Sequence, residues 1–238
     1  MFGFGFDFMY LLFIAPALLL AMLAQWMVRS AYEQMSQVRA SMSGYEAARR
    51  ILDAGGLHNV DIEQIPGQLS DHYDPGAKVL RLSPEVFSGH SMASVGIAAH
   101  EAGHALQDAR GYAPLKIRNL AVPAANFGSS FGTILLMIGM VMVFGQMAFL
   151  GKWVFLAGIV AFGATVAFQL VNLPVEFDAS SRAKVELINL GIISGPELPY
   201  VSKVLNAAAL TYVAATLQAV LTLAYYIFRF MQATSRER

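Results

Sequence analysis

The sequence has no cysteine and little charge. Without cysteine it can form no disulfide, zinc ribbon, iron–sulfur site or cysteine nucleophile. Only 13% of its 238 residues are charged and 56% are hydrophobic, whereas soluble domains carry about 25% charged residues. This hydrophobicity excludes intrinsic disorder, and the equal numbers of basic and acidic residues, 16 each, give no indication of nucleic-acid binding. An integral membrane protein with one modest aqueous domain remains.

Four runs without a charged residue are long enough to cross a bilayer. They contain 21, 33, 23 and 25 residues, and a spanning helix needs about 20 mostly apolar residues. We therefore predict four transmembrane helices, at 8–28, 127–149, 153–173 and 204–228. The longest run is expected to begin with a juxtamembrane stretch, 119–126, that Pro123 breaks.

The first run could instead be a secretory signal peptide. It has no positively charged segment before it, and its flanking cations begin afterwards, at Arg29. It is also longer than the apolar part of a typical signal peptide. We therefore expect this run to anchor the protein in the membrane.

Lysine and arginine are unevenly distributed around the four runs. The segments 29–118 and 174–203 hold nine and three of them, and the opposite side holds four. Because short cytoplasmic segments are enriched in these residues, we predict a multi-pass cell-membrane protein with both segments in the cytoplasm and the N-terminus outside. The basic tail, 229–238, opposes this orientation.

The segment 29–126 is expected to form the aqueous domain. Ser43 and Glu46 have the spacing of a capping box, which marks the start of a helix. Two stretches alternate between apolar and polar residues, as half-buried strands do. Helices are predicted over 43–53 and 91–110, and strands over 60–65 and 78–83.

The second of these helices contains the sequence His100-Glu101-Ala102-Gly103-His104. Histidines four residues apart share one helical face, so both imidazoles can bind one metal ion. Glu101 can take a proton from water at that ion. Zn²⁺ lowers the pKa of bound water to about 7 and polarises carbonyl groups, which makes amide hydrolysis feasible. The alternative, two histidines packed in a core, would bury polar groups at a high cost.

A catalytic zinc ion usually has three protein ligands and one open position. A third histidine six residues after the second would indicate a metzincin, but Arg110 stands there. Glu176 is the preferred third ligand, because two predicted spans separate it from His104 and return the chain to the same membrane face. Pro174 is expected to begin the helix that carries it. The rival ligands are Asp178, Asp108, Glu186, His58, His72 and His90.

Two of these acids have other expected roles. Asp108 lies one turn beyond His104, which suits hydrogen bonding to a metal ligand. Asp178 and Arg182 are spaced i, i+4 on one predicted helix and are expected to form an ion pair.

The sequences 100–107 and 176–183 resemble those of the YugP-type neutral zinc metallopeptidases of bacterial membranes, and the resemblance extends over roughly 29–225. More distantly the chain is similar to the HtpX and CAAX-prenyl membrane gluzincins. The resemblance implies a membrane-embedded zinc protease. Its implied site has His100, His104 and Glu176 as zinc ligands and Glu101 as the base.

The resemblance has further implications. An acid follows the ligand glutamate by four residues in the distant relatives, but here Ser180 stands there, so Asp178 is a candidate for orienting His100. In gluzincins the strand before the motif helix is an edge that pairs with substrate, which implies strand addition at 78–83; an ordinary half-buried strand is the alternative.

Peptide hydrolysis also needs a hydrogen-bond donor for the oxyanion, and Arg182 is preferred because it lies within two turns of Glu176. The other candidates are Tyr73, His72, His90 and Tyr200.

The predicted fold is a mainly α integral membrane protein, with four transmembrane helices and a small α+β gluzincin-like zinc-protease domain. Its parts are an N-terminal transmembrane helix (1–28), the zinc-peptidase domain (29–126), a transmembrane hairpin (127–173), a juxtamembrane helix with the third ligand (174–203), and a fourth transmembrane helix with the tail (204–238).

The predicted function is zinc-dependent endoproteolysis at the cytoplasmic membrane surface. The expected partners are the lipid bilayer and membrane-associated or misfolded polypeptides, and no nucleic acid. Two alternatives stay open. One is a site-2-type intramembrane protease, although the Leu-Asp-Gly signature of that class is missing. The other is a non-catalytic scaffold with a structural metal site, for which Glu101 would have no use.

Overall fold

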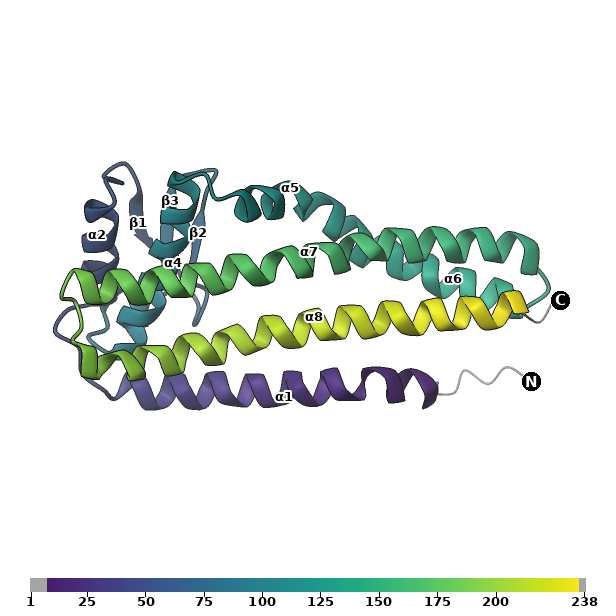
Figure 1. Ribbon diagram of the computed structural model, residues 1–238, viewed down its shortest axis with the longest axis horizontal. Helices are drawn as coiled ribbons and strands as arrows, with labels where there is room; N and C mark the ends of the chain where they lie inside the picture. The colour runs from purple at the N-terminus through teal and green to yellow at the C-terminus, as the bar shows by residue number, and fades with distance from the viewer. Residues whose placement is uncertain (1–7, 236–238) are drawn as a thin grey trace. The chain divides into compact units, whose positions relative to one another are not determined.

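The protein is mainly helical in the computed structural model, which describes residues 8–235 (Figure 1). The helices are α1 (Phe8–Ser36), α2 (Gly44–Ala54), α3 (Pro84–Ser88), α4 (Met92–Ala109), α5 (Ala113–Phe127), α6 (Thr133–Phe144), α7 (Ala148–Asn189) and α8 (Leu198–Ser235). A π-helical segment (Gly128–Gly132) and a 3₁₀ turn (Gly195–Glu197) complete the helical part. The strands are β1 (Asp61–Gln64), β2 (His72–Asp74) and β3 (Val79–Leu82).

The chain divides into two compact units. The helical unit comprises Met1–Met22, Ile117–Leu173 and Tyr212–Arg238. The mixed unit comprises Leu23–Lys116 and Pro174–Thr211 and contains the whole sheet. The helices α1, α5, α7 and α8 each contribute residues to both units.

Within residues 8–235, four helical segments are long and apolar enough to cross a membrane. They are Phe8–Ser36, Ala113–Phe144, Ala148–Asn189 and Gly195–Ser235. Each overlaps one of the four predicted spans. The predicted span 127–149 extended too far at its C-terminal end, because α6 ends at Phe144 and α7 begins at Ala148.

Two prolines lie inside helices where the sequence predicted a break or a start. Helix α5 is continuous through Pro123, and α7 is continuous through Pro174. A proline removes one backbone donor and crowds the preceding turn. The turns on either side keep their own hydrogen bonds, so a long helix can tolerate this local loss. The predicted break at 119–126 and the predicted helix start at Pro174 are therefore wrong.

The helical unit has an apolar core in which α6 and α7 approach closely. Leu136, Phe155 and Tyr225 are almost completely buried there. A Cβ atom added at Gly139 would lie 2.4 Å from the backbone nitrogen of Phe155, and one added at Gly158 would lie 2.6 Å from that of Leu136. These two glycines therefore permit a helix contact closer than any side chain would allow.

The sheet of the mixed unit has the order β1-β3-β2, with β1 parallel and β2 antiparallel to β3. The predicted strands 60–65 and 78–83 are confirmed as β1 and β3. Strand β2 was not predicted, because three residues are too short to show alternation. Since β3 has a partner on each side, it is not an edge, and the expected strand addition at 78–83 is wrong. The edges are β1 and β2.

Helix α4 lies in the core of the mixed unit, where it contacts α2, β2 and β3 (Figure 1). Its apolar side chains, including Val95, Ala98 and Ala102, are buried. Both predicted helices begin as expected. Ser43 and Glu46 form the capping box of α2, and the Ser91 hydroxyl accepts a hydrogen bond from Ser94 N at the start of α4.

Candidate active site

The two histidines of α4 meet Glu176 of α7 inside the mixed unit. Nε2 of His100 lies 3.3 Å from Oε2 of Glu176, and Nε2 of His104 lies 3.5 Å from the same oxygen. Their ligand atoms all lie within 4.8 Å of one another, and the three side chains are largely buried. Residues from two distant segments of the sequence thus converge at one point.

This arrangement fits a zinc ion. Ligand atoms around tetrahedral zinc lie about 2.0–2.2 Å from the metal, and therefore about 3.3–3.5 Å from one another. The two distances to Glu176 have these values. Two imidazole nitrogens and one carboxylate oxygen also form a donor set found in catalytic zinc sites, which leave a fourth position open for water.

Gly103 allows α7 to come close enough to α4 for this convergence. A Cβ atom at position 103 would lie 2.6 Å from the backbone oxygen of Ala179. Ala179 is fully buried and lies one turn after Glu176 on α7. A side chain at position 103 would push this turn away from α4, because the obstacle is backbone. The glycine between the two histidines therefore helps to position Glu176.

Glu101 is buried beside the histidines. Its Oε2 accepts a hydrogen bond of 3.1 Å from the backbone nitrogen of Tyr73 in β2. Burial raises the pKa of the Glu101 carboxyl to about 7, although the nearby His100 opposes this rise. A carboxyl group with a pKa near neutrality can both accept and return a proton, which is what a general base needs.

The Glu176 carboxyl has the opposite electrostatic behaviour. Its burial alone would raise its pKa, but the facing imidazoles of His100 and His104 outweigh burial and hold the pKa well below its usual range. The side chain is therefore anionic at neutral pH. A buried anion facing two imidazoles is suited to binding a cation.

A different side chain supports each histidine. Nδ1 of His100 lies 3.1 Å from the hydroxyl oxygen of Ser180. Nδ1 of His104 lies 3.0 Å from Oε1 of Gln107. The prediction that Asp178 orients His100 is thus wrong. Ser180, which stands where the distant relatives have an acid, contacts His100 instead. Sequence analysis gave Gln107 no role, although a polar residue one turn after His104 on an apolar helix was a usable signal.

Asp178 and Arg182 form the predicted ion pair, with Nε of Arg182 2.5 Å from Oδ2 of Asp178. The Asp178 carboxylate also accepts a hydrogen bond of 2.8 Å from Nε2 of Gln107. The Arg182 guanidinium lies over the ring of Tyr112, 5.6 Å from its centre. Arg182 is therefore connected to His104 through Asp178 and Gln107.

Asp108 connects α4 to Tyr73 of β2 and to Lys78, the residue before β3. Its Oδ2 accepts a hydrogen bond of 2.8 Å from the Tyr73 hydroxyl and lies 2.5 Å from Nζ of Lys78. The expected hydrogen bond from Asp108 to a metal ligand is therefore wrong. Its contacts link α4 to β2, the strand whose backbone holds Glu101.

The other rival ligands lie outside the convergence. Nδ1 of His58 lies 3.1 Å from Asp53, and Glu186 lies 3.9 Å from Arg110. Nδ1 of His72 and Nδ1 of His90 lie close to backbone oxygens two residues earlier, at 2.9 and 3.1 Å. The side chain of Tyr200 is exposed.

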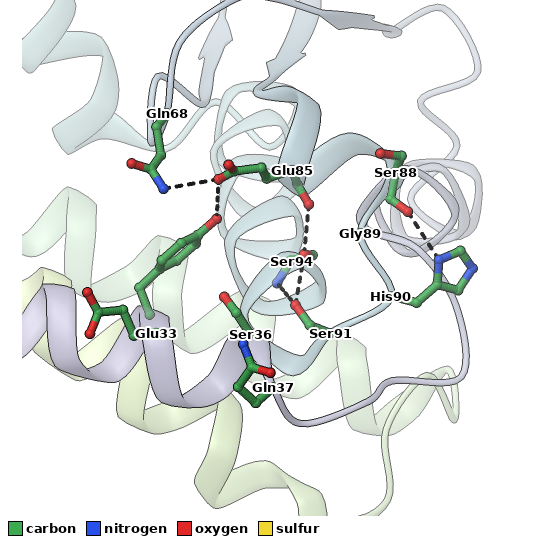
Figure 2. Close-up of a pocket in the computed structure, with 11 residues that line it drawn as sticks. Glu33, Ser36, Gln37, Gln68, Glu85, Ser88, Gly89, His90, Ser91 and Ser94 are labelled. Atoms are coloured by element: carbon green, nitrogen blue, oxygen red, sulfur yellow. Dashed lines mark hydrogen bonds between the residues drawn. The ribbon is translucent and has the colours of Figure 1, made fainter.

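A separate polar pocket of about 490 Å³ lies where the end of α1 meets α3 and the start of α4 (Figure 2). The Glu85 carboxylate accepts hydrogen bonds from the Tyr32 hydroxyl (2.8 Å) and from Nε2 of Gln68 (3.1 Å). The Ser94 hydroxyl donates to the Glu85 backbone oxygen. The lining of this pocket includes none of the converging residues, so it is distinct from the site on α4 and α7.

Two histidines spaced i, i+4, a glutamate between them and a distant glutamate facing both are typical of a zinc-dependent peptidase. Comparison with known proteins agrees with this class. Residues 10–231 match the family described as "Putative neutral zinc metallopeptidase", and the chain belongs to this family.

A second comparison covers nearly the whole chain. The chain is 43% identical over 225 residues to "Putative membrane protease YugP" of Bacillus subtilis (strain 168), an alignment that covers 94% of this chain and 97% of that protein. No solved structure matches. The resemblance predicted from the sequence motifs is confirmed by these comparisons.

Proposed function

We propose that this protein is a membrane-bound zinc endopeptidase of the gluzincin type. The observation that carries the proposal is the convergence of His100, His104 and Glu176, in which both histidine nitrogens lie at tetrahedral-zinc spacing from one Glu176 oxygen and Glu101 is buried beside them. Membership of a zinc metallopeptidase family and the name of the relative support the same activity.

The roles of the side chains follow from their positions. His100, His104 and Glu176 would hold the metal. Zn²⁺ bound there supplies activation of water and polarisation of the substrate carbonyl. Glu101 accepts a proton from the attacking water and returns it to the leaving amine nitrogen. Since its Oε2 already accepts the Tyr73 N–H, we assign the proton transfer to Oε1.

The substrate is proposed to be an extended polypeptide. Strand addition needs a sheet edge near the catalytic base. Strand β2 is an edge of this sheet, and Tyr73 within it contacts Glu101 through its backbone. We therefore assign the substrate-pairing edge to β2 in place of β3.

The membrane assignment rests on the apolar helices and on the position of Glu176. On α7, Glu176 directly follows the charge-free stretch 153–175. If this stretch crosses the bilayer, Glu176 lies at a membrane surface, where membrane-associated or misfolded polypeptides are accessible. The lysine and arginine distribution supports the cytoplasmic surface. The catalytic role of Arg182 stays a prediction, because its contacts support a role in holding Asp178.

Substitution of Glu101 by glutamine tests the proposal. The purified full-length protein is expected to contain zinc and to cleave casein or itself in a chelator-sensitive manner. Glu101→Gln leaves all three ligands in place and should retain the zinc, whereas loss of a general base should reduce cleavage by about 10²–10⁴-fold.

The outcomes distinguish the alternatives. Wild-type protein that binds zinc without cleaving any polypeptide would favour a scaffold with a structural metal site. Cleavage at the wild-type rate by Glu101→Gln would contradict the role of Glu101 while leaving the zinc site intact.

A further inference from the structure

The side chain of Gln107 is completely buried and makes three hydrogen bonds. Its Oε1 lies 3.0 Å from Nδ1 of His104. Its Nε2 donates to the backbone oxygen of Val175 and to Oδ2 of Asp178, both at 2.8 Å. One amide of α4 therefore contacts a metal-ligand candidate on its own helix and two acceptors on α7.

The partners of this amide determine its orientation. A backbone carbonyl and a carboxylate can only accept hydrogen bonds, so the amide group that faces them must be the NH₂ of Gln107. The reversed orientation would place the amide oxygen against two acceptors. The orientation thus follows from the chemistry of the neighbours and does not depend on distinguishing oxygen from nitrogen in the amide itself.

The orientation of the amide in turn determines the tautomer of His104. The amide oxygen only accepts, so Nδ1 of His104 must carry the hydrogen. In a neutral imidazole with hydrogen on Nδ1, the other nitrogen, Nε2, has its lone pair available for a metal ion. This nitrogen is the one that lies 3.5 Å from Glu176.

We propose that Gln107 is a positioning residue that holds His104 in its metal-binding tautomer and fixes the ring relative to α7. The inference deepens the proposed function, because it rests on zinc binding by His104. Val175, whose carbonyl receives the amide, directly precedes Glu176. Gln107 therefore connects the support of one ligand to the backbone that carries another. Asp178, paired with Arg182, accepts a second hydrogen bond from the same amide nitrogen.

His100 provides an internal comparison. Its Nδ1 faces the Ser180 hydroxyl at 3.1 Å. A hydroxyl group can donate or accept, so this contact is compatible with either tautomer. The control of tautomer is therefore asymmetric, and His104 should respond to changes in its support more strongly than His100.

The experiment compares Gln107→Met with Leu106→Ala in full-length protein. Methionine is similar in length to glutamine but cannot accept the Nδ1 hydrogen. Leu106 is the buried neighbour of Gln107 in the apolar core, so its truncation destabilises the same helix without touching the support of His104. Zinc affinity is measured by competition with a chelator. The tautomers of the histidines are measured by nitrogen NMR on metal-free protein.

We expect Nδ1 of His104 to carry the hydrogen in metal-free wild-type protein and to lose this preference in Gln107→Met. Zinc affinity should fall by about 10–100-fold in Gln107→Met, as for other residues that support metal ligands, and stay unchanged in Leu106→Ala. Unchanged affinity in Gln107→Met, or an equal loss in both variants, would overturn the proposal.

The nitrogen NMR measurement on the metal-free wild-type protein does not depend on whether the variants fold or on whether the protein binds zinc. Hydrogen on Nε2 but not on Nδ1 of His104 in the metal-free protein would overturn the inference by itself. If instead the wild-type protein shows the expected tautomer but binds no zinc, the proposed function fails while the positioning of His104 by Gln107 stands.

Discussion

The polar side chains of the site are held through atoms that the proposed chemistry does not use. Ser180 and Gln107 contact the Nδ1 atoms of the two histidines, whose Nε2 atoms face Glu176. The backbone of Tyr73 holds one oxygen of Glu101. Buried polar groups need partners because desolvation is costly. Here these partners also fix the direction in which the reactive atoms point.

At the residue scale, the structure predicts different effects for two acids that lie two positions apart. Glu176→Ala removes the carboxylate that faces both imidazoles, so zinc binding should weaken sharply and activity should be lost. Asp178→Ala removes only one of the two acceptors of Gln107. Because Val175 still holds the amide, zinc affinity should fall by no more than about tenfold, the lower end of such effects.

Zinc content after dialysis against a mild chelator, measured for both variants and the wild type, tests this difference. If Glu176→Ala keeps its zinc while Asp178→Ala loses it, the two acids have exchanged roles and the ligand assignment is wrong.

At the scale of elements, the site depends on the contact between α4 and the part of α7 in the mixed unit. Helix α4 supplies three of the four central residues, and α7 supplies the fourth. The small side chains Ala102, Ala179 and Ala183 are buried near this contact. A change in the distance between these helices would therefore act on the metal site without altering any ligand.

Gly103→Ala tests this dependence. The added Cβ atom would lie 2.6 Å from the Ala179 oxygen, so α7 must move and carry Glu176 away from the histidines. We expect weakened zinc binding and reduced thermal stability. This loss should occur although alanine favours a helix over glycine by about 1 kcal/mol.

Gly163→Ala is the matched control. Gly163 also lies within α7, but a Cβ atom there would have no neighbour within 4 Å. This variant should keep wild-type zinc affinity and equal or greater stability. Equal behaviour of Gly103→Ala and Gly163→Ala would show that the close approach of the helices does not position the ligand.

At the scale of the whole molecule, the four apolar helical segments and the charge distribution predict a definite orientation. A cysteine introduced at Asp61 in β1 should be shielded from a membrane-impermeant thiol reagent in intact cells. One introduced at Gln146, between α6 and α7, should be labelled. Both side chains are exposed in the structure, and the absence of native cysteine removes background labelling.

Permeabilised cells provide the control, because both cysteines should then react. Labelling of position 61 but not of position 146 in intact cells would place the proposed catalytic site on the outer surface.

Much of the protein was determined locally by its sequence. The charge-free runs predicted the apolar helices, the capping box predicted the start of α2, and the spacing of His100 and His104 placed both on one helical face. These features depend on residues within a few turns of one another, where composition and periodicity are sufficient. The pairing of Asp178 with Arg182 followed for the same reason.

Only the tertiary structure decided which distant groups meet. It placed β3 between two strands, extended α7 through Pro174, and brought Asp108 to Tyr73 in place of a histidine. It also placed the Gln107 amide between His104 and α7. Several buried donors and acceptors could have formed equally good hydrogen bonds. Local sequence carries no information on which of them lie close together in space. Packing of α4 against α7, made possible by the missing side chain of Gly103, selected among them.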